Sequence, residues 1–136
     1  MSADTFLDTN VLLYALTQDD KRSLRAQSLL QEGGTISVQV LNEFTNVALR
    51  KLQRPWPEIT LALVTLRILF PDPLAITADT HRTAVTIAQD EGFSLYDALI
   101  IASALEATCT TLLSEDMQNG RTIRNCLTIR NPFIGP

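Results

Sequence analysis

The chain has 136 residues, 46% of them hydrophobic and 19% charged, and its formal net charge at pH 7 is −4. This composition excludes a disordered chain, and the length suits one domain, residues 1–136, that buries roughly 70% of its unfolded surface. No apolar stretch is long enough to span a membrane and the N-terminus has no signal-peptide pattern, so we expect a cytoplasmic protein. The negative charge argues against a general nucleic-acid binder, but it is compatible with an acidic pocket that binds a cation.

Predicted strands and helices alternate along the sequence. Short apolar runs predict strands at residues 5–7, 35–37, 74–76, 110–114 and 127–129. Apolar residues at helical spacing predict a first helix that starts over residues 11–16, and further helices at residues 21–31, 38–53, 58–69, 80–90 and 94–107. This alternation predicts an α/β fold with a mainly parallel sheet and helices on both faces. Right-handed crossovers then place the carboxyl ends of the strands along one edge of the domain.

Four acidic residues fall at this predicted edge. Asp8 and Asp116 each follow a strand, in "TFLDTNVLLY" and "TTLLSED". Glu43 and Asp97 lie in the early turns of two helices, in "SVQVLNEF" and "SLYDALIIASAL". Because clustered carboxylates repel each other, a cation between them would stabilise the arrangement. Mg²⁺ or Mn²⁺ suits such oxygen ligands, and either ion activates water and stabilises charge on a phosphoryl oxygen.

Each acid also has a purely structural interpretation. Asp8 or Asn10 suits a helix cap, and Asp97 follows Ser94 by three residues, as in a capping box. Glu43 suits a solvated helix face, and Asp116 suits a turn. We favour one shared site, because two strand ends and the early turns of two helices converge on the same predicted edge.

Five blocks of the sequence occur in the order and at the spacing of a known family. They are "FLDTNVLLYA", "NEF", "SLYDALIIASAL", "LLSEDMQNG" and "NPF", and they extend from Thr5 to Phe133. "DTN" alone is a weak motif, but together the blocks resemble the PIN domain and in particular VapC-type toxins. The resemblance implies a three-layer α/β/α sandwich with a central, mainly parallel sheet, and Mg²⁺- or Mn²⁺-dependent cleavage of RNA.

The resemblance also assigns roles to the four acids. Asp8 matches the first acid and Asp97 the third, and both are expected to bind the metal ion directly. Glu43 matches the second acid and Asp116 the fourth; both are expected in the metal site, where either can orient the attacking water. Because no histidine or lysine stands where a general base is needed, we expect a metal-activated water to be the nucleophile.

Two neutral residues complete the predicted site. Asn10 matches the family's Asn or Ser that braces the turn, and Ser114 matches the Ser or Thr that helps to hold the site. The fourth acid is a departure, since many relatives have an asparagine where Asp116 stands and an aspartate where Asn119 stands. The fourth position therefore stays open between these two residues, with Asp116 preferred because it is the acid.

An acidic protein needs local positive charge to hold RNA. Arg50 and Arg54 lie seven and eleven residues after Glu43, and Arg50 falls on the same helix face, so we predict both as RNA-binding residues. A solvated helix face is the alternative interpretation. Further basic residues that could flank the acidic site are Lys21, Arg22, Arg25, Arg121 and Arg124.

The resemblance to VapC-type toxins implies three partners. The substrate is RNA, a cognate antitoxin is expected to cover the active site, and the toxin itself is expected to form a homodimer. The first helix, with Val11, Leu12 and Leu16, is a candidate surface for a flexible antitoxin tail that folds on binding.

Two other functional classes are alternatives to the ribonuclease. A phosphate-signalling receiver or phosphatase fold needs a second acid close to Asp8 and a lysine at a later strand end. Lys21 and Lys51, the chain's only lysines, fall instead on predicted helices or their edges. A catalytically silent PIN-like module that binds RNA or protein would have lost one or more acids. All four acids are present, so the silent module is kept only as the alternative.

Overall fold

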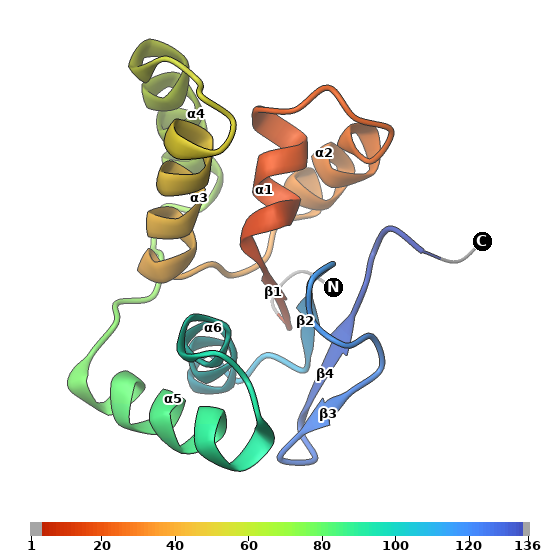
Figure 1. The fold of residues 1–136 in the computed structure, drawn as a ribbon. Helices are drawn as coiled ribbons and strands as arrows, with labels where there is room; N and C mark the ends of the chain where they lie inside the picture. Colours follow the sequence, from red (N-terminus) through yellow and green to blue (C-terminus); the bar gives the residue numbers. More distant parts are fainter. Residues whose placement is uncertain (1–3, 135–136) are drawn as a thin grey trace.

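The computed structural model describes residues 4–134, which form a four-stranded sheet and six helices (Figure 1). In chain order the elements are β1 (Thr5–Leu7), α1 (Thr9–Leu16), α2 (Ser23–Glu32), α3 (Val38–Arg50), α4 (Trp56–Leu69), α5 (Ala78–Glu91), α6 (Leu95–Glu106), β2 (Thr111–Leu113), β3 (Thr122–Ile123) and β4 (Leu127–Arg130). Helices lie on both sides of the sheet, which confirms the three-layer α/β/α sandwich. Within residues 4–134 no helix is long and apolar enough to cross a membrane.

The sheet has the order β1-β2-β4-β3, and its three longer strands run parallel to one another. Phe6, Leu112 and Ile129 lie in register across these strands, and all three side chains are fully buried. The predicted, mainly parallel sheet is therefore confirmed. β3 was not predicted: it is a two-residue strand antiparallel to β4, too short to show an apolar period in the sequence.

The predicted strands at 35–37 and 74–76 are reduced to single bridges. Thr35 pairs with Phe6, and Ser37 pairs with Leu74, both in parallel orientation. The chain reaches β1 here because Gly34 has a φ of +147°, and a Cβ at that position would lie 2.9 Å from the backbone oxygen of Thr5. A glycine is thus required for this close approach.

Helix α6 occupies the centre of the molecule. Residues 98–104 are all buried, and the helix packs against both α5 and α3. A sequence with so little polar surface predicts a central helix, and the structure confirms it. α6 therefore gives a fixed platform for the acid in its first turn.

The first helix differs from its predicted form. It begins at Thr9 rather than Val11, because the Asp8 side chain caps it. Val11 and Leu12 are fully buried in the core, so they do not form the surface expected to meet an antitoxin tail. Leu16 is half-buried and packs against the same core.

Candidate active site

Asp8 joins β1 to α1 and is 5% exposed. Its Oδ1 accepts a hydrogen bond of 2.7 Å from the backbone N–H of Thr9, and its Oδ2 accepts one of 2.7 Å from the hydroxyl of Ser114. Burial, with a smaller contribution from the charges of Glu43 and Asp97, raises the pKa of Asp8 to about 7 in spite of these two hydrogen bonds. Asp8 is therefore both a helix cap and a buried carboxyl group whose ionisation is unfavourable.

Glu43 is held from two helices. Its Oε1 accepts a hydrogen bond of 3.0 Å from the hydroxyl of Thr9, and its Oε2 accepts one of 3.0 Å from the side-chain amide of Gln39. Thr9 thus contacts two acids, Asp8 through its backbone and Glu43 through its side chain. Sequence reasoning missed Thr9, because its partner on α3 is 34 residues away and only the fold brings the two together.

Asp97 lies in the first turn of α6, where its backbone N–H donates a hydrogen bond of 3.2 Å to the hydroxyl of Ser94. The capping interaction expected at Ser94 is therefore present through the backbone N–H of Asp97, and Ser94 also interacts with the Asp97 carboxyl group, which partly lowers its pKa. Partial burial raises the pKa of Asp97, and the nearby charge of Asp116 adds to the effect.

Asp116 is exposed in the loop after β2. Its charge acts on Asp97, so the two carboxylates belong to the same part of the site. Asn119, the other candidate for the fourth position, points its Oδ1 to the backbone N–H of Asn131 at 2.8 Å. Of the two residues, Asp116 is the one that interacts with another of the four acids.

Ser114 is fully buried and connects Asp8 to the loop that carries Asp116. Its hydroxyl donates to Asp8 and accepts a hydrogen bond of 3.3 Å from the backbone N–H of Met117. This pair of bonds fixes the loop relative to the end of β1. It is an arrangement suited to the supporting role expected of Ser114.

Asn10 does not form the bracing hydrogen bond that the sequence led us to expect. Both polar atoms of its side chain are buried, and neither has a hydrogen-bond partner among residues 4–134. A buried amide without a partner costs free energy, on the order of 1–3 kcal/mol. It lies in the first turn of α1, two residues from Asp8, where a bound ligand or its hydration shell would satisfy it.

The donor set suits a hard divalent cation that keeps part of its water shell. The interacting groups are carboxylates, which offer oxygen ligands, and Glu43 and Asp97 both act electrostatically on the buried Asp8. Within the described residues, no three acidic, histidine or cysteine side chains converge closely enough to enclose an ion by themselves. The carboxylates that could hold a divalent cation therefore lie near one another without forming a closed centre of the zinc type among the described residues.

The two predicted RNA-binding arginines lie apart from this cluster. A cavity of about 450 Å³ opens beside Glu43, and the side chains around it come from Gln39, Asn42, Asn46, Val47 and Tyr96. Neither Arg50 nor Arg54 lines it. Arg54 is 3.7 Å from Glu58 and lines a second cavity next to the α1–α2 turn, whereas Arg50 is exposed at the end of α3.

Solved structures share this fold at low sequence identity. A toxin–antitoxin complex from Klebsiella pneumoniae has a TM-score of 0.71 and 20% identity, with 95% of this chain and 98% of that chain covered. VapBC2 from Rickettsia felis, bound to a DNA fragment from its promoter, has a TM-score of 0.66 and 19% identity, covering 93% and 97%. Mycobacterium tuberculosis VapC20, described as a sarcin-ricin loop cleaving toxin, has a TM-score of 0.65 and 21% identity, covering 82% and 91%.

No curated protein matches the chain at a significant level. The family model described as the PIN domain matches residues 5–121, which include Asp8, Glu43, Asp97 and Asp116 and most of the chain. The chain therefore belongs to the PIN domain family.

Proposed function

We propose that this protein is a metal-dependent endoribonuclease and the toxin of a toxin–antitoxin pair. The observation that carries the proposal is the environment of Asp8, a buried carboxyl group that Glu43 and Asp97 repel. Such an arrangement destabilises the fold unless a cation binds there, which suits a site kept for chemistry. Support also comes from the similar structures, which include a toxin–antitoxin complex and a toxin that cleaves the sarcin-ricin loop.

The residues of the site divide the work of binding and orientation. Asp8, Asp97 and Glu43 would hold the ion, with Asp116 at the exposed rim. When bound, Mg²⁺ or Mn²⁺ supplies an activated water and stabilises the charge that develops on the phosphoryl oxygens. Each oxygen of Asp8 accepts a single hydrogen bond, so each keeps a lone pair for a ligand. Glu43, whose two oxygens accept hydrogen bonds from Thr9 and Gln39, would orient the attacking water.

The cavity beside Glu43 is suited to a nucleotide of the substrate. Tyr96 is 62% exposed there and directly precedes Asp97, and Asn42 and Asn46 are exposed on α3. Single-stranded RNA is recognised by stacking of bases on aromatic rings and by hydrogen bonds to base edges. Arg50, the last residue of α3, and Arg54, which follows the helix, remain proposed contacts to the RNA backbone.

Partner proteins have a candidate surface on α4. Leu61 and Ile68, seven residues apart on this helix, are 68% and 75% exposed, and Val64 between them is 42% exposed. A stripe of exposed apolar side chains at helical spacing is typical of an interaction surface. The proposed partners are a cognate antitoxin and a second copy of the chain, which would form a homodimer. With RNA as its substrate, the protein is proposed to act in the cytoplasm.

The test compares the wild type with Asp8→Asn. We expect wild-type expression to arrest growth and the purified protein to cut RNA in the presence of Mn²⁺ but not of EDTA. Asp8→Asn is expected to abolish both effects while it still binds the antitoxin, because the substitution changes one buried oxygen and no surface. Growth without arrest, together with no cleavage by the wild type, would instead favour the catalytically silent binding module.

A further inference from the structure

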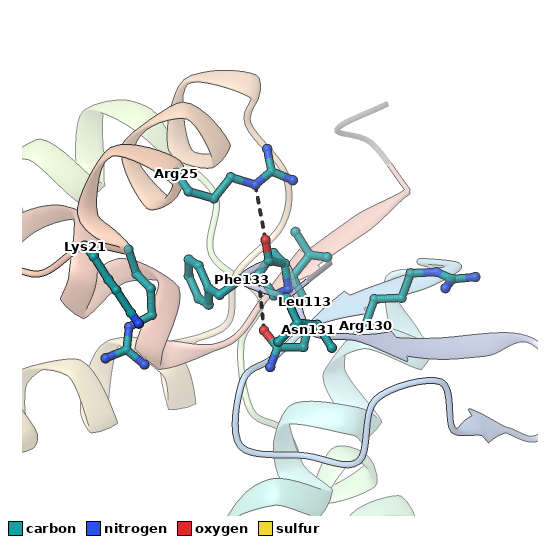
Figure 2. Close-up of a pocket in the computed structure, with 9 residues that line it drawn as sticks. Lys21, Arg25, Leu113, Arg130, Asn131 and Phe133 are labelled. Carbon is teal, nitrogen blue, oxygen red and sulfur yellow. Dashed lines mark hydrogen bonds between the residues drawn. The ribbon is translucent and has the colours of Figure 1, made fainter. Parts of the chain in front are cut away.

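A basic groove of about 910 Å³ lies between the α1–α2 turn and the carboxyl ends of β2 and β4 (Figure 2). The residues that line it are Lys21, Arg22, Arg25, Leu113, Arg130, Asn131, Pro132, Phe133 and Ile134. Four of these side chains are cationic and none is acidic. The groove therefore carries a concentrated positive charge on a protein whose net charge is negative.

Three of the four cations have no carboxylate partner. Arg22 is neutralised, since it binds Asp20 at 2.8 Å and Glu115 at 2.6 Å. Lys21, Arg25 and Arg130 are exposed and form no ion pair with any residue of the described chain, 4–134. Arg25 donates a hydrogen bond of 3.3 Å to the carbonyl of Pro132, which is uncharged, so its charge stays uncompensated.

The walls of the groove are held in place before any ligand binds. The ring of Phe133 packs edge-on against Tyr14, with 5.3 Å between centroids, and the guanidinium of Arg22 lies 4.4 Å above the Tyr14 ring. The backbone N–H of Phe133 donates to Asn131 at 2.9 Å, and Arg25 ties Pro132 to α2. Figure 2 shows the two hydrogen bonds, with Phe133 lying between the helix that carries Arg25 and the strand ends at Leu113 and Arg130. Such preorganisation lowers the entropic cost of binding.

The groove and the acidic site share one loop. Leu113 lines the groove, and the next residue, Ser114, donates its hydroxyl to Asp8. Glu115 then binds Arg22 at the wall of the groove, while Asp116 acts on Asp97 on the acidic side. Consecutive residues of this loop therefore interact with the groove and with the acidic site, so an RNA strand that follows the loop would run from the carboxylates to the groove.

We propose that the basic groove binds the sugar-phosphate backbone of the RNA strand next to the bond that is cut. The inference rests on the proposed ribonuclease function. Lys21, Arg25 and Arg130 come from a turn, a helix and a strand end, so their charges are spread along the groove, as a polyanion requires. The exposed part of Phe133 adds a surface for a base, and positive grooves with aromatic side chains are typical of proteins that bind single-stranded nucleic acid.

Binding is tested in the Asp8→Asn background, which removes cleavage. The change is Lys21→Gln with Arg130→Gln, because neither side chain has a structural partner within residues 4–134. We expect at least a tenfold loss of affinity for a 12-nucleotide single-stranded RNA at low salt. The slope of log K against log salt should become less steep by about 1.4, since the variant removes two phosphate contacts and each contributes about 0.7 in a single strand. Fluorescence anisotropy over a salt series measures both quantities.

The matched control is Arg67→Gln with Arg82→Gln, which removes two exposed charges on α4 and α5 that do not line the groove. Because total charge changes equally, the control separates local contacts from the general field of the protein. Equal affinities and slopes in the groove and control variants would overturn the proposal. An acidic peptide that binds the wild type and is lost in the groove variant, with RNA binding kept, would also overturn it in favour of a protein ligand.

Cleavage separates this inference from the proposed function. With Asp8 intact, the groove variant should lose at least ten times more kcat/KM on a long RNA than on a tetranucleotide, which is too short to occupy both sites. A similar loss of kcat/KM on both substrates would contradict the groove proposal and leave the ribonuclease proposal standing. If the wild type cleaves neither RNA, the ribonuclease proposal fails, while the anisotropy comparison still decides whether the groove binds RNA.

Discussion

Asp8 couples the stability of the protein to its site. In the unfolded chain its carboxyl group has the ordinary pKa of an aspartate, about 3.8, whereas burial raises the pKa to about 7 in the folded protein. A group whose folded pKa is raised stabilises the fold where it is protonated. Its contribution is therefore fully present below about pH 4 and is lost as the pH rises through about 7. At neutral pH without a cation, this single carboxylate opposes folding.

Asp8→Asn tests this coupling in the presence of EDTA. The variant should gain stability relative to the wild type as the pH rises from 5 to 8, by about 3 kcal/mol at most. The gain will be smaller if the asparagine cannot accept both of the hydrogen bonds that Asp8 accepts from Thr9 and Ser114. Urea denaturation at several pH values measures the difference between the two proteins. Parallel stability curves would show that Asp8 ionises normally.

Individual elements show what a sequence predicts and what it does not. The apolar periods of α3, α5 and α6 predicted those helices, and strand alternation with helices predicted the parallel sheet, because both signals are local. The Thr9–Glu43 contact and the bridges of Thr35 and Ser37 were not predictable, since each depends on segments far apart in the chain. Asn10 was expected to brace the turn, but its side-chain amide has no hydrogen-bond partner among residues 4–134, which depends on the tertiary surroundings.

Thr9→Val tests the connection between α1 and α3. Valine keeps the branched shape and the backbone N–H that donates to Asp8, but it removes the hydroxyl that holds Glu43. We expect a loss of about 1 kcal/mol in stability and a larger fall in kcat than in 1/KM, because Glu43 loses its fixed orientation. The matched control is Thr45→Val on α3, whose hydroxyl bonds only to the carbonyl of Leu41 in the same helix. Equal effects on kcat in the two variants would remove Thr9 from the site.

At the scale of the whole molecule, acidic and basic side chains are concentrated in separate regions. The four acids, drawn from β1, α3, α6 and the loop after β2, act on one another on one side of that loop, and the basic groove lies on the other. The parallel sheet makes this possible, because the carboxyl ends of its strands share one edge. A net charge of −4 thus hides a local separation of sign, which is what the proposed binding of one RNA strand to both parts would require.

Cation binding should therefore appear as a gain in the stability of the whole fold. Saturating Mg²⁺ or Mn²⁺ relieves the repulsion around Asp8, and a ligand at 100 times its Kd stabilises a protein by about 2.7 kcal/mol. Asp97→Asn should keep the fold, since the capping bond to Ser94 uses the backbone N–H of residue 97, and should show a much smaller rise in Tm with metal. Asp90→Asn, an exposed acid of α5, is the matched control and should respond like the wild type. Equal metal-induced shifts in all three proteins, measured by thermal denaturation, would place the ion away from Asp97.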